Sequence, residues 1–562
     1  MNADTSNSCR LLSRPCVFPL LMVVLFAGAA SEHMHAQAYK ISKINPPGAI
    51  ASYSTGINKN NIVVGNFIDS QAHTVGFGYL GGSTYKTFKA PGSNGTFTRV
   101  NGINDSNTAV GDFFGNDNFF HGYLLKNGKT FTQYDIASGV STSLFGINNL
   151  GNFVGATGSG GPNQGFVNIG GNVSLFYGAG NDNTFALAIN NLNQVVGQYY
   201  DDASNSHGYY RDASGAITEI IFPGALQTAC TGISDSGEIV GWYVDAAGLT
   251  HGFTDIGGNF QASSLYQILG MNNKGTLVGY YFGAGANGSQ AFGFLAIPTP
   301  LNLTTLQIPR AQSTSIYGVN NANNYTGQYT DSQGNTHGML VVGNQVTPFD
   351  DPNAAPGQTY GQGVNASKVV VGYYLDAQNF GHGFQYNNGT FTEIGPPGNI
   401  ESWAENINDA GQIAGTFIDS NNLQHAFVLK NGNYTQLDVP NTNGTSYGWG
   451  INNAGTVTVS ATDAFGYEEA YIYKGGKYAN INVPGVAQSF GHSINKNNAV
   501  VLTCIDYNGA YHGALLNGTS FYLFDDPKGT DLRGDGLNDN GVFVGRFLPT
   551  GSSLYQGFKG SF

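Results

Sequence analysis

A ten-residue unit that recurs twelve times is the feature of this sequence that most constrains its fold. The clearest copy reads Gly-Ile-Asn-Asp-Ser-Asn-Thr-Ala-Val-Gly over 102–111. We call the first residue of each copy the anchor. The anchors are Gly56, Gly102, Gly146, Ala188, Gly232, Gly270, Gly318, Gly363, Asn406, Gly450, Ser493 and Gly536. Their nearly constant spacing predicts a repeat architecture.

Each position of the unit has a structural reason. Asn follows the anchor by two residues in every copy except the one with Ser234, and a Gly closes every copy except those with Val459 and Leu502. Asn with Gly or Asn three residues later makes a tight turn, so two strands reverse direction there. Further β-rich runs and Asn-Gly turns supply a third and a fourth strand. Four short strands in about 44 residues is the length of one propeller blade.

Composition and the chain ends predict the architecture. Eighty-two Gly, 13% aromatic residues and only 10% charged residues favour an all-β fold. Residues 39–46 resemble a fourth strand without a first, and the sixth copy stops at its third strand. We therefore expect two six-bladed β-propellers in tandem, over 39–297 and 302–562, joined by a Pro-containing linker at 298–301. One large twelve-bladed ring is the alternative.

The segment 1–38 predicts a secretory signal. Arg10 and Arg14 precede an apolar run over 16–30, and Ala36-Gln37-Ala38 follows as a small-residue cleavage site. A membrane anchor is the lesser alternative, because the run is shorter than the ~20 residues that a span needs. We expect cleavage after Ala38, a secreted or cell-envelope location, and no membrane insertion once the signal is removed.

Charge and motifs exclude several functions. The net charge of −13 argues against a nucleic-acid partner and against anionic membrane surfaces. Only Cys230 and Cys504 remain after signal removal, so no disulfide framework is expected. The sequence contains no Cys-x-x-Cys, His-Glu-x-x-His, phosphate loop or Gly-x-Ser-x-Gly elbow. We expect neither a cofactor nor a metal.

The chain resembles the extracellular repeat proteins called the HAF family. The Gly-Ile-Asn turns carry the resemblance together with His-Gly-Phe strands and the tripeptide His425-Ala426-Phe427, which gives the family its name. It covers nearly everything from Tyr39 to Phe562 and implies export from a bacterium. The family has no agreed activity or catalytic residues, so the resemblance implies no site. The copies with Val459 and Leu502 depart from the pattern, and we expect their blades to pack less regularly.

An Asp followed six residues later by a His recurs in six copies. Such a pair suits a catalytic dyad or a metal site. A group needed for one reaction appears once, however, so the repetition favours a structural clasp in which the Asp accepts from turn amides. The pairs are Asp201/His207, Asp245/His251, Asp331/His337, Asp376/His382, Asp419/His425 and Asp506/His512.

The positions one and three residues before the anchor change identity in every copy. By strand alternation they face away from the Ser or Thr found four residues before most anchors. In the first half of the chain they include Tyr53, Arg99 and Asn101. In the last four copies they are Trp403, Glu405, Tyr447, Trp449, Phe490, His492, Arg533 and Asp535, which we expect to converge on one mouth of the second ring.

These eight residues predict a binding site. Aromatic faces with a few polar groups suit sugar rings or peptide side chains, so we expect a non-enzymatic scaffold that binds extracellular polysaccharide or protein. Large side chains that merely plug the channel are the structural alternative. The functional alternative is a carbohydrate hydrolase or lyase that uses Glu405 and Asp535, because glycosidases need two carboxyl groups ~5 to 10 Å apart.

Overall fold

A computed structural model describes residues 37–178, 183–263, 265–285, 288–525 and 529–562. Its regular secondary structure within these ranges consists of forty-eight strands, β1 to β48, and the predicted all-β class is confirmed. The predicted signal lies outside the described ranges except for Gln37 and Ala38. A helix long and apolar enough to cross a membrane does not occur in these ranges.

The strands form four-stranded antiparallel units of the size and strand order of propeller blades, and one parallel pairing, of Thr74 with Phe97, joins the first two complete units into a single sheet. We divide them into an N-terminal set, β1 to β24, and a C-terminal set, β25 to β48. The N-terminal set comprises β1 (Gln37–Ile44), β2 (Ala49–Ile57), β3 (Val63–Asp69), β4 (Thr74–Tyr79), β5 (Tyr85–Phe88), β6 (Ser93–Ile103), β7 (Thr108–Gly115), β8 (Phe120–Lys126), β9 (Thr130–Tyr134), β10 (Ser141–Ile147), β11 (Phe153–Gly158), β12 (Gln164–Ile169), β13 (Asn172–Phe176), β14 (Asn183–Ile189), β15 (Val195–Tyr200), β16 (Ser206–Arg211), β17 (Ile217–Ile220), β18 (Gln227–Ile233), β19 (Ile239–Val244), β20 (Thr250–Ile256), β21 (Asn259–Ser263), β22 (Gln267–Met271), β23 (Leu277–Gly285) and β24 (Gly288–Pro300).

The C-terminal set repeats this order. It comprises β25 (Asn302–Leu306), β26 (Ser313–Val319), β27 (Tyr325–Thr330), β28 (Thr336–Val342), β29 (Gln345–Phe349), β30 (Thr359–Val364), β31 (Val370–Leu375), β32 (Gly381–Asn387), β33 (Thr390–Ile394), β34 (Glu401–Ile407), β35 (Ile413–Ile418), β36 (Gln424–Lys430), β37 (Asn433–Gln436), β38 (Ser446–Ile451), β39 (Val457–Thr462), β40 (Glu468–Lys474), β41 (Lys477–Asn480), β42 (Gln488–Ile494), β43 (Val500–Ile505), β44 (Tyr511–Asn517), β45 (Ser520–Phe524), β46 (Gly529–Leu537), β47 (Phe543–Pro549) and β48 (Gln556–Ser561). We call the strand that carries the anchor the inner strand of its sheet.

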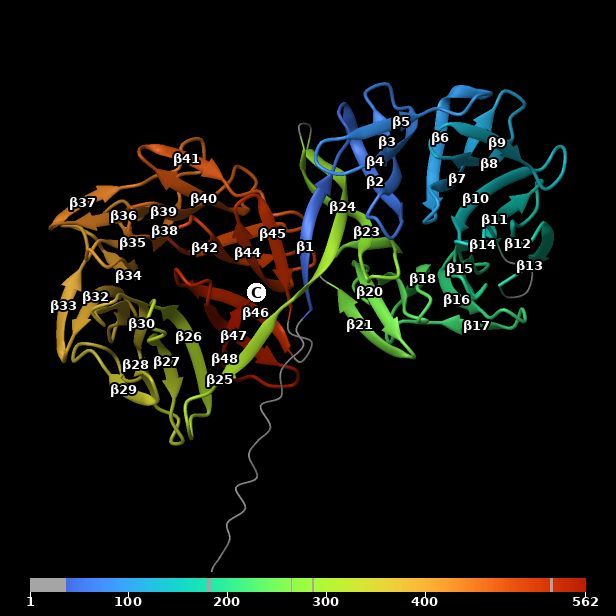
Figure 1. Cartoon of the computed structure of the whole chain (residues 1–562). Coiled ribbons are helices and arrows are strands. Elements are labelled where there is room, and N and C mark those ends of the chain that lie inside the picture. Colours follow the sequence, from blue (N-terminus) through green and yellow to red (C-terminus); the bar gives the residue numbers. More distant parts are fainter. Residues whose placement is uncertain (1–36, 179–182, 264, 286–287, 526–528) are drawn as a thin grey trace, which may run out of the picture. The chain divides into compact units, whose positions relative to one another are not determined.

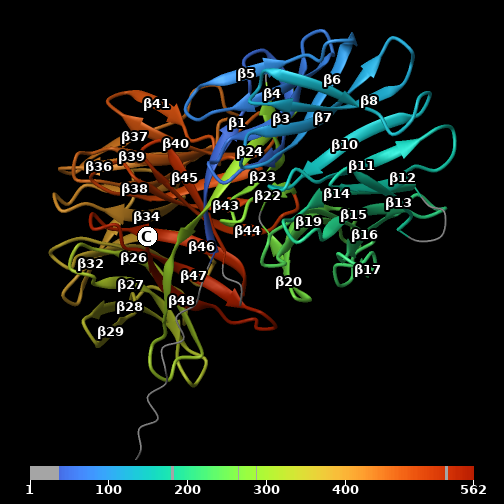
Figure 2. The ribbon, with the colours of Figure 1, turned by 45° about the vertical axis from the view of Figure 1, so that its right-hand side comes forward.

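The last sheet of each set takes its fourth strand from the start of that set. β1 pairs antiparallel with β24, and β25 pairs antiparallel with β48. The early strands thus cover edges that would otherwise stay open. β1 also pairs with β45 on its other side, which joins two four-stranded units into one eight-stranded sheet (Figure 2).

The structure differs from the sequence-based expectation at the proposed linker, 298–301. β24 continues through Pro298-Thr299-Pro300, and these residues pair with β1. Beyond Ala296 the strand has no register partner in β23, so it is paired on the β1 side only. A strand tolerates proline where its N–H side has no partner, and Pro298 and Pro300 share one side because they are two residues apart.

The anchor turns close through the Asn that follows the anchor. In the first copy, Oδ1 of Asn58 accepts hydrogen bonds from the backbone N–H groups of Asn60 at 3.0 Å and Ile62 at 3.1 Å. Asn61 then adopts a φ of 58°, a left-handed conformation that Asn tolerates and that Gly151 supplies in the third copy. The predicted Asx-type turn is confirmed.

The same amides connect each sheet to the next one. In the C-terminal set, Nδ2 of the turn Asn donates to the main-chain oxygen of the corresponding Asn in the following sheet, at 2.8 to 3.4 Å. The donor–acceptor pairs are Asn320–Asn365, Asn365–Asn408, Asn408–Asn452, Asn452–Asn495, Asn495–Asn538 and Asn538–Asn320. The series returns to its starting residue after six sheets, which follow one another around a centre (Figure 1). In the N-terminal set, the last sheet reaches back to the first through a bond from Asn272 to Asn58 at 3.0 Å.

The closing glycines let an aromatic ring of the third strand lie across the second. Gly241 is the register partner of Phe253, which is fully buried. A Cβ at Gly241 would lie 1.9 Å from the main-chain oxygen of Ala229 and 2.9 Å from the Phe253 ring. In the eleventh copy, Leu502 replaces the glycine and its partner is Ala514, so the large and small residues are exchanged between the strands.

The two copies without a closing Gly differ in regularity. In most sheets the inner strand shifts register between the residue two before the anchor and the anchor itself, and the eleventh copy keeps this position at Gly491 and Ser493. In the tenth copy the shift extends from Gly448 to Ile451. The strand register is therefore less regular in the tenth copy and not in the eleventh, while less regular packing of these two sheets stays a prediction.

The predicted cleavage after Ala38 falls inside β1. Ala38 is fully buried and pairs with Thr299 of β24 and Phe524 of β45. Cleavage at that bond would leave β1 to begin at Tyr39. The signal peptide itself remains a prediction.

Candidate functional site

The eight residues predicted to bind a ligand lie on the inner strands of four neighbouring sheets in the C-terminal set. β34, β38, β42 and β46 each carry two of them. On β34 they alternate with Ser402 and Ala404, which are buried, because successive side chains of a strand point to opposite faces. Seven of the eight are partly exposed, and Asp535 is buried.

Trp449 joins two of these sheets. Its ring lies 4.6 Å from that of His492 on the next inner strand, measured between centroids. Its Nε1 donates a hydrogen bond to Oγ of Ser460 at 3.0 Å, and Tyr447 stacks beside it with centroids 6.1 Å apart. The indole is therefore held in one orientation by contacts on three sides.

His492 is neutral at physiological pH. Burial lowers the pKa of its imidazole, and the positive charges of Arg546 and Arg533 lower it further, to about 3. Phe490, two residues earlier on β42, lies 6.4 Å from the imidazole between ring centroids. A neutral imidazole offers one hydrogen-bond donor and one acceptor.

Asp535 is paired with an arginine that the sequence pattern did not single out. Nη1 of Arg546 donates to Oδ2 of Asp535 at 2.9 Å, and the guanidinium lies 4.8 Å from the centroid of the Tyr317 ring. Burial raises the pKa of Asp535 to about 6, although Arg546 and Arg533 act to lower it. The carboxylate therefore depends on this ion pair for its charge.

Arg533 belongs to a second ion pair near the start of β46. Nε and Nη2 of Arg533 donate to the two oxygens of Asp531, at 2.6 and 3.0 Å. The hydroxyl of Tyr555 also donates to Asp531, and the Arg533 guanidinium lies 4.2 Å from the centroid of the Tyr511 ring. These contacts fix the guanidinium against an aromatic face.

Glu405 holds its proton at neutral pH. Burial raises the pKa of its carboxyl group, and the negative charge of Asp535 raises it further, to about 8. Glu405 is on β34, the third inner strand of the set, and Asp535 is on β46, the sixth. The charge of Asp535 thus acts on a carboxyl group three sheets away.

Trp403 is separate from the other aromatic residues. Its ring lies against Gly381 of the preceding sheet, where an added Cβ would be 2.8 Å from the indole. The structure therefore brings together Tyr447, Trp449, Phe490 and His492 in one aromatic group. Trp403 contributes a partly exposed face on the neighbouring strand.

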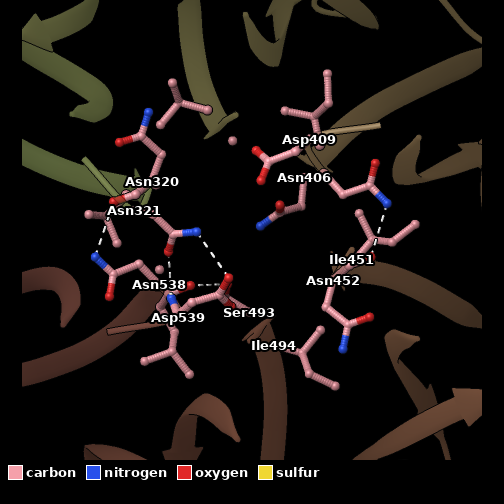
Figure 3. Close-up of a pocket in the computed structure, with 18 of the residues that line it drawn as sticks. Asn320, Asn321, Asn406, Asp409, Ile451, Asn452, Ser493, Ile494, Asn538 and Asp539 are labelled. Atoms are coloured by element: carbon pink, nitrogen blue, oxygen red, sulfur yellow. Dashed lines mark hydrogen bonds between the residues drawn. The ribbon is translucent and has the colours of Figure 1, made fainter. Parts of the chain in front are cut away.

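A cavity of about 60 Å³ lies at the anchor turns of the C-terminal set (Figure 3). Turn residues of all six sheets line it, and none of the eight predicted residues does. Two anchors of this set are not glycine: Asn406 directs its side chain toward the centre of the cavity, and Oγ of Ser493 donates to the main-chain oxygen of Leu537 at 3.4 Å. Oδ1 of Asp409 accepts from the backbone N–H of Ala366 at 2.8 Å, so this carboxylate supports the turns.

Arg546 and Tyr317 are two site residues that were not predicted from the sequence. Tyr317 is the residue before the anchor Gly318, in the first copy of the C-terminal set. Arg546 directly follows a closing Gly and is the register partner of Arg533. The residue after the closing Gly also changes identity between copies, and that variation is the signal that would have found Arg546.

In the N-terminal set, the predicted residues Arg99 and Asn101 meet at one carboxylate. Arg99 holds both oxygens of Asp112, with Nε donating at 2.9 Å and Nη2 at 2.5 Å. Nδ2 of Asn101 donates to Oδ1 at 3.1 Å, and Oγ of Ser143 on the next sheet donates to Oδ2 at 2.8 Å. Asp112 is fully buried and fully engaged in hydrogen bonds. Tyr53 lies apart from this cluster, 4.9 Å from Tyr280 between ring centroids.

The repeated Asp–His pairs are structural clasps, as their repetition predicted. Oδ1 of Asp245 accepts from the backbone N–H groups of Ala247 and Leu249, each at 2.9 Å, and Oδ2 lies 3.0 Å from Nε2 of His251. The other five pairs have His–Asp distances of 3.2 to 3.7 Å. Within the described ranges, no group of three or more His, Cys, Asp or Glu side chains is arranged to hold a metal.

Comparisons with known proteins give only distant similarities. No protein-family model matches the chain, and no curated protein matches it significantly. The lectin SapL1, solved with alpha methyl fucoside, is 12% identical with a TM-score of 0.31, and the match covers 44% of this chain and 94% of the lectin. The BP39L lectin from Burkholderia pseudomallei is 11% identical with a TM-score of 0.24, covering 59% and 94%. TolB from Acinetobacter baumannii is 10% identical with a TM-score of 0.29, covering 44% and 64%. Scores of this size establish neither a shared ligand nor a shared activity.

Proposed function

We propose that the chain is an exported, non-enzymatic scaffold that binds extracellular polysaccharide or protein through the inner strands of its C-terminal set. The observation that carries the proposal is the contrast between a constant turn and inner-strand side chains that change from copy to copy. These side chains combine Trp449, Tyr447 and Phe490 with the hydrogen-bonding groups of His492 and Arg533. Aromatic faces beside a few fixed polar groups suit a sugar ring.

The proposal includes the arrangement of the sheets. Two six-bladed propellers in tandem are supported by hydrogen bonds that return to their start after six sheets, at Asn538–Asn320 and Asn272–Asn58. A single twelve-bladed ring would instead continue from the sixth copy to the seventh. Small-angle scattering of the exported chain discriminates the two, because one twelve-bladed ring is wider and has a larger central opening than two smaller ones.

Export and membership of the HAF family are part of the same proposal. They are supported by the residues before Tyr39 and by the repeated Gly-Ile-Asn turns. Expression in a Gram-negative host, followed by fractionation and N-terminal sequencing, tests the export. A cytoplasmic chain that still begins at Met1 would contradict it.

The test of binding is a double variant, Trp403→Ala with Trp449→Ala, screened against glycan and peptide arrays. Loss of a glycan signal supports a polysaccharide ligand, and loss of a peptide signal supports a protein ligand. Trp403→Phe with Trp449→Phe is the matched control, because it keeps an aromatic face at both positions. An unchanged profile in a folded alanine variant would exclude the site.

A carbohydrate hydrolase or lyase is the second candidate function. The observation in its favour is the raised pKa of Glu405. Burial and the negative charge of Asp535 raise the pKa of this carboxyl group to about 8. A protonated acid and an ionised carboxylate are the two groups that glycoside hydrolysis needs. Polysaccharide turnover that disappears in Glu405→Gln and in Asp535→Asn would favour this candidate over the scaffold.

A further inference from the structure

Partly exposed aromatic residues also gather on the N-terminal set, away from the proposed site. One cluster lies on the second sheet, where the ring centroids of Phe97 and Phe114 are 5.3 and 5.1 Å from that of Phe120. A second cluster joins the sixth sheet to the first, where Tyr53 and Tyr266 lie 4.9 and 6.0 Å from Tyr280. We call these six residues the aromatic strip.

The strip spans three neighbouring sheets. The turn Asn272 of the sixth sheet donates to Asn58 of the first, and Oγ1 of Thr55 on the first inner strand donates to the main-chain oxygen of Val100 on the second at 2.8 Å. The two clusters are therefore carried by consecutive sheets, and the first sheet contributes Tyr53 between them.

The repeat does not require aromatic residues at these positions. Phe97 is five residues before its anchor, and the corresponding residues of the first, third, fourth and fifth copies are small or polar: Ala51, Ser141, Asn183 and Gln227. Phe114 is three residues after a closing Gly, where the third copy has Gly158. Buried core aromatics such as Phe77 and Phe253 recur in the third strand, whereas the strip residues are partly exposed, and the Phe97 position is not aromatic in the four copies just given.

The polar side chains beside the aromatic strip have no net charge, because the positive charge of Arg99 is paired with the negative charge of Asp112. The Arg99 guanidinium lies 5.0 Å from the centroid of the Phe97 ring and is neutralised by its two hydrogen bonds to Asp112. The neutral side chains of Ser143 and Asn101 bind the same carboxylate. Sugars are recognised by aromatic faces with hydrogen-bonding groups at the ring edge, and a neutral ligand suits a site whose charges already cancel.

We propose that the aromatic strip is a second binding site, specific for a neutral oligosaccharide. It is separate from the C-terminal set, so it stands or falls independently of the function proposed above. With two sites on one chain, a polymeric glycan is bound more tightly than its short fragments, since the second contact becomes intramolecular.

The chain provides a reporter for this site. It contains three Trp residues, and Trp403→Phe with Trp449→Phe leaves only Trp242, a partly exposed residue of the N-terminal set. Trp242 is on β19, in the sheet that precedes Tyr266 and Tyr280. Fluorescence of this variant then reports on the N-terminal set alone.

The experiment titrates this variant with cellohexaose, laminarihexaose and mannohexaose, with hexagalacturonic acid as the charged contrast. We expect a saturable change in Trp242 fluorescence with at least one neutral hexasaccharide. Adding Phe97→Ala and Phe120→Ala should weaken that binding about tenfold through loss of the stacking faces. Phe120→Leu keeps apolar bulk without an aromatic face and should also weaken binding. It replaces the alanine variant in the test if that variant does not fold.

Phe465→Ala is the control, because Phe465 is 84% exposed on a hairpin of the C-terminal set. It should leave the titration unchanged. Binding of hexagalacturonic acid or of an apolar hexapeptide alone would overturn the proposal. So would the absence of any response to the neutral sugars, or binding that persists in folded Phe97→Ala and Phe120→Ala chains.

Discussion

Nη1 of Arg546 donates a hydrogen bond to Oδ2 of Asp535 at 2.9 Å, and neither side chain is more than 14% exposed. A buried ion pair of this kind contributes little by itself, but removing one partner leaves the other charge without compensation. We expect Arg546→Met to destabilise the protein by about 3 to 5 kcal/mol in chemical denaturation.

Arg533→Met is the comparison for that prediction. Arg533 and Asp531 are 26% and 18% exposed, so the solvent screens their pair more strongly. We expect a loss of about 1 kcal/mol or less there. The double variant Asp535→Asn with Arg546→Met should recover most of the stability. Equal losses in Arg546→Met and Arg533→Met would contradict the prediction that the more buried ion pair matters more.

Ser234 offers a stabilising substitution. It is the one copy whose turn lacks the amide that donates to the next sheet, although the neighbouring Asn190 still donates to its main-chain oxygen at 2.9 Å. We expect Ser234→Asn to add a hydrogen bond to the following turn and to raise the unfolding free energy by about 0.5 to 1.5 kcal/mol. Asn190→Ser, which removes the equivalent donor, should lower it by a similar amount. A destabilised Ser234→Asn chain would show that this turn is built differently.

The exchange of residue sizes between Leu502 and Ala514 predicts a compensating pair of substitutions. Leu502→Gly alone leaves a cavity and should cost about 2 to 5 kcal/mol. Ala514→Phe alone overfills the same space and should cost about 1 to 3 kcal/mol. Together they recreate the Gly–Phe pair found in copies such as Gly241–Phe253 and Gly372–Phe384, and we expect thermal denaturation of the double variant to recover most of both losses. Strictly additive losses would contradict this.

His512 makes the protein less stable as the pH rises above neutrality. Burial alone would lower the pKa of His512, but Asp525 and Asp506 outweigh it and raise this pKa to about 10, above the unfolded value of 6.5. The folded protein therefore binds the proton more tightly than the unfolded chain does. The resulting stabilisation is complete below pH 6.5 and is lost as the pH rises toward 10. His512→Gln should flatten the fall in Tm over that interval, and an unchanged pH profile would argue against a charged His512.

Glu405 also makes the folded protein less stable as the pH rises, but in a lower pH interval than His512 does. Because burial raises its pKa to about 8 in the folded protein, from 4.5 in the unfolded chain, ionisation of this carboxyl group costs stability as the pH rises from 4.5 to 8. Glu405→Gln cannot ionise, so its Tm should gain on that of the unsubstituted protein across this interval. Asn406→Gln, a neutral change at the next residue, should leave the pH dependence as it was.

The repeat is the reason that the architecture could be predicted from the sequence. The turn pattern seen in one copy could be compared with that in the eleven others. Asn58 and its counterparts specify the turn through hydrogen bonds to amides of the turn itself, so the chain sequence alone contains the information. Pro298 was misleading for a related reason. Its tolerance in β24 depends on the absence of a partner on one side, and only the pairing of distant strands determines that.

The candidate site was less accessible to sequence reasoning. Alternation along β34 correctly separated Trp403 and Glu405 from the buried Ser402 and Ala404, because strand periodicity is local. The partner Arg546 comes from the adjacent strand, and the effect of Asp535 on Glu405 acts between two sheets that are far apart in the sequence. The sequence pattern singled out Tyr53, but the other five residues of the aromatic strip stand outside the two positions before the anchor, and their contacts with one another depend on the pairing of strands.

The pairing of β1 with β24 has a consequence for how the chain folds. The first described strand must wait for the last strand of its set, and β25 must likewise wait for β48. Until β1 docks, β24 exposes an unpaired edge that invites association with other chains. Contacts this distant in sequence also slow folding, because a long loop must close before they form. Correct assembly of each set therefore requires that its N-terminal strand does not pair with another chain before the last strand of the same set has formed.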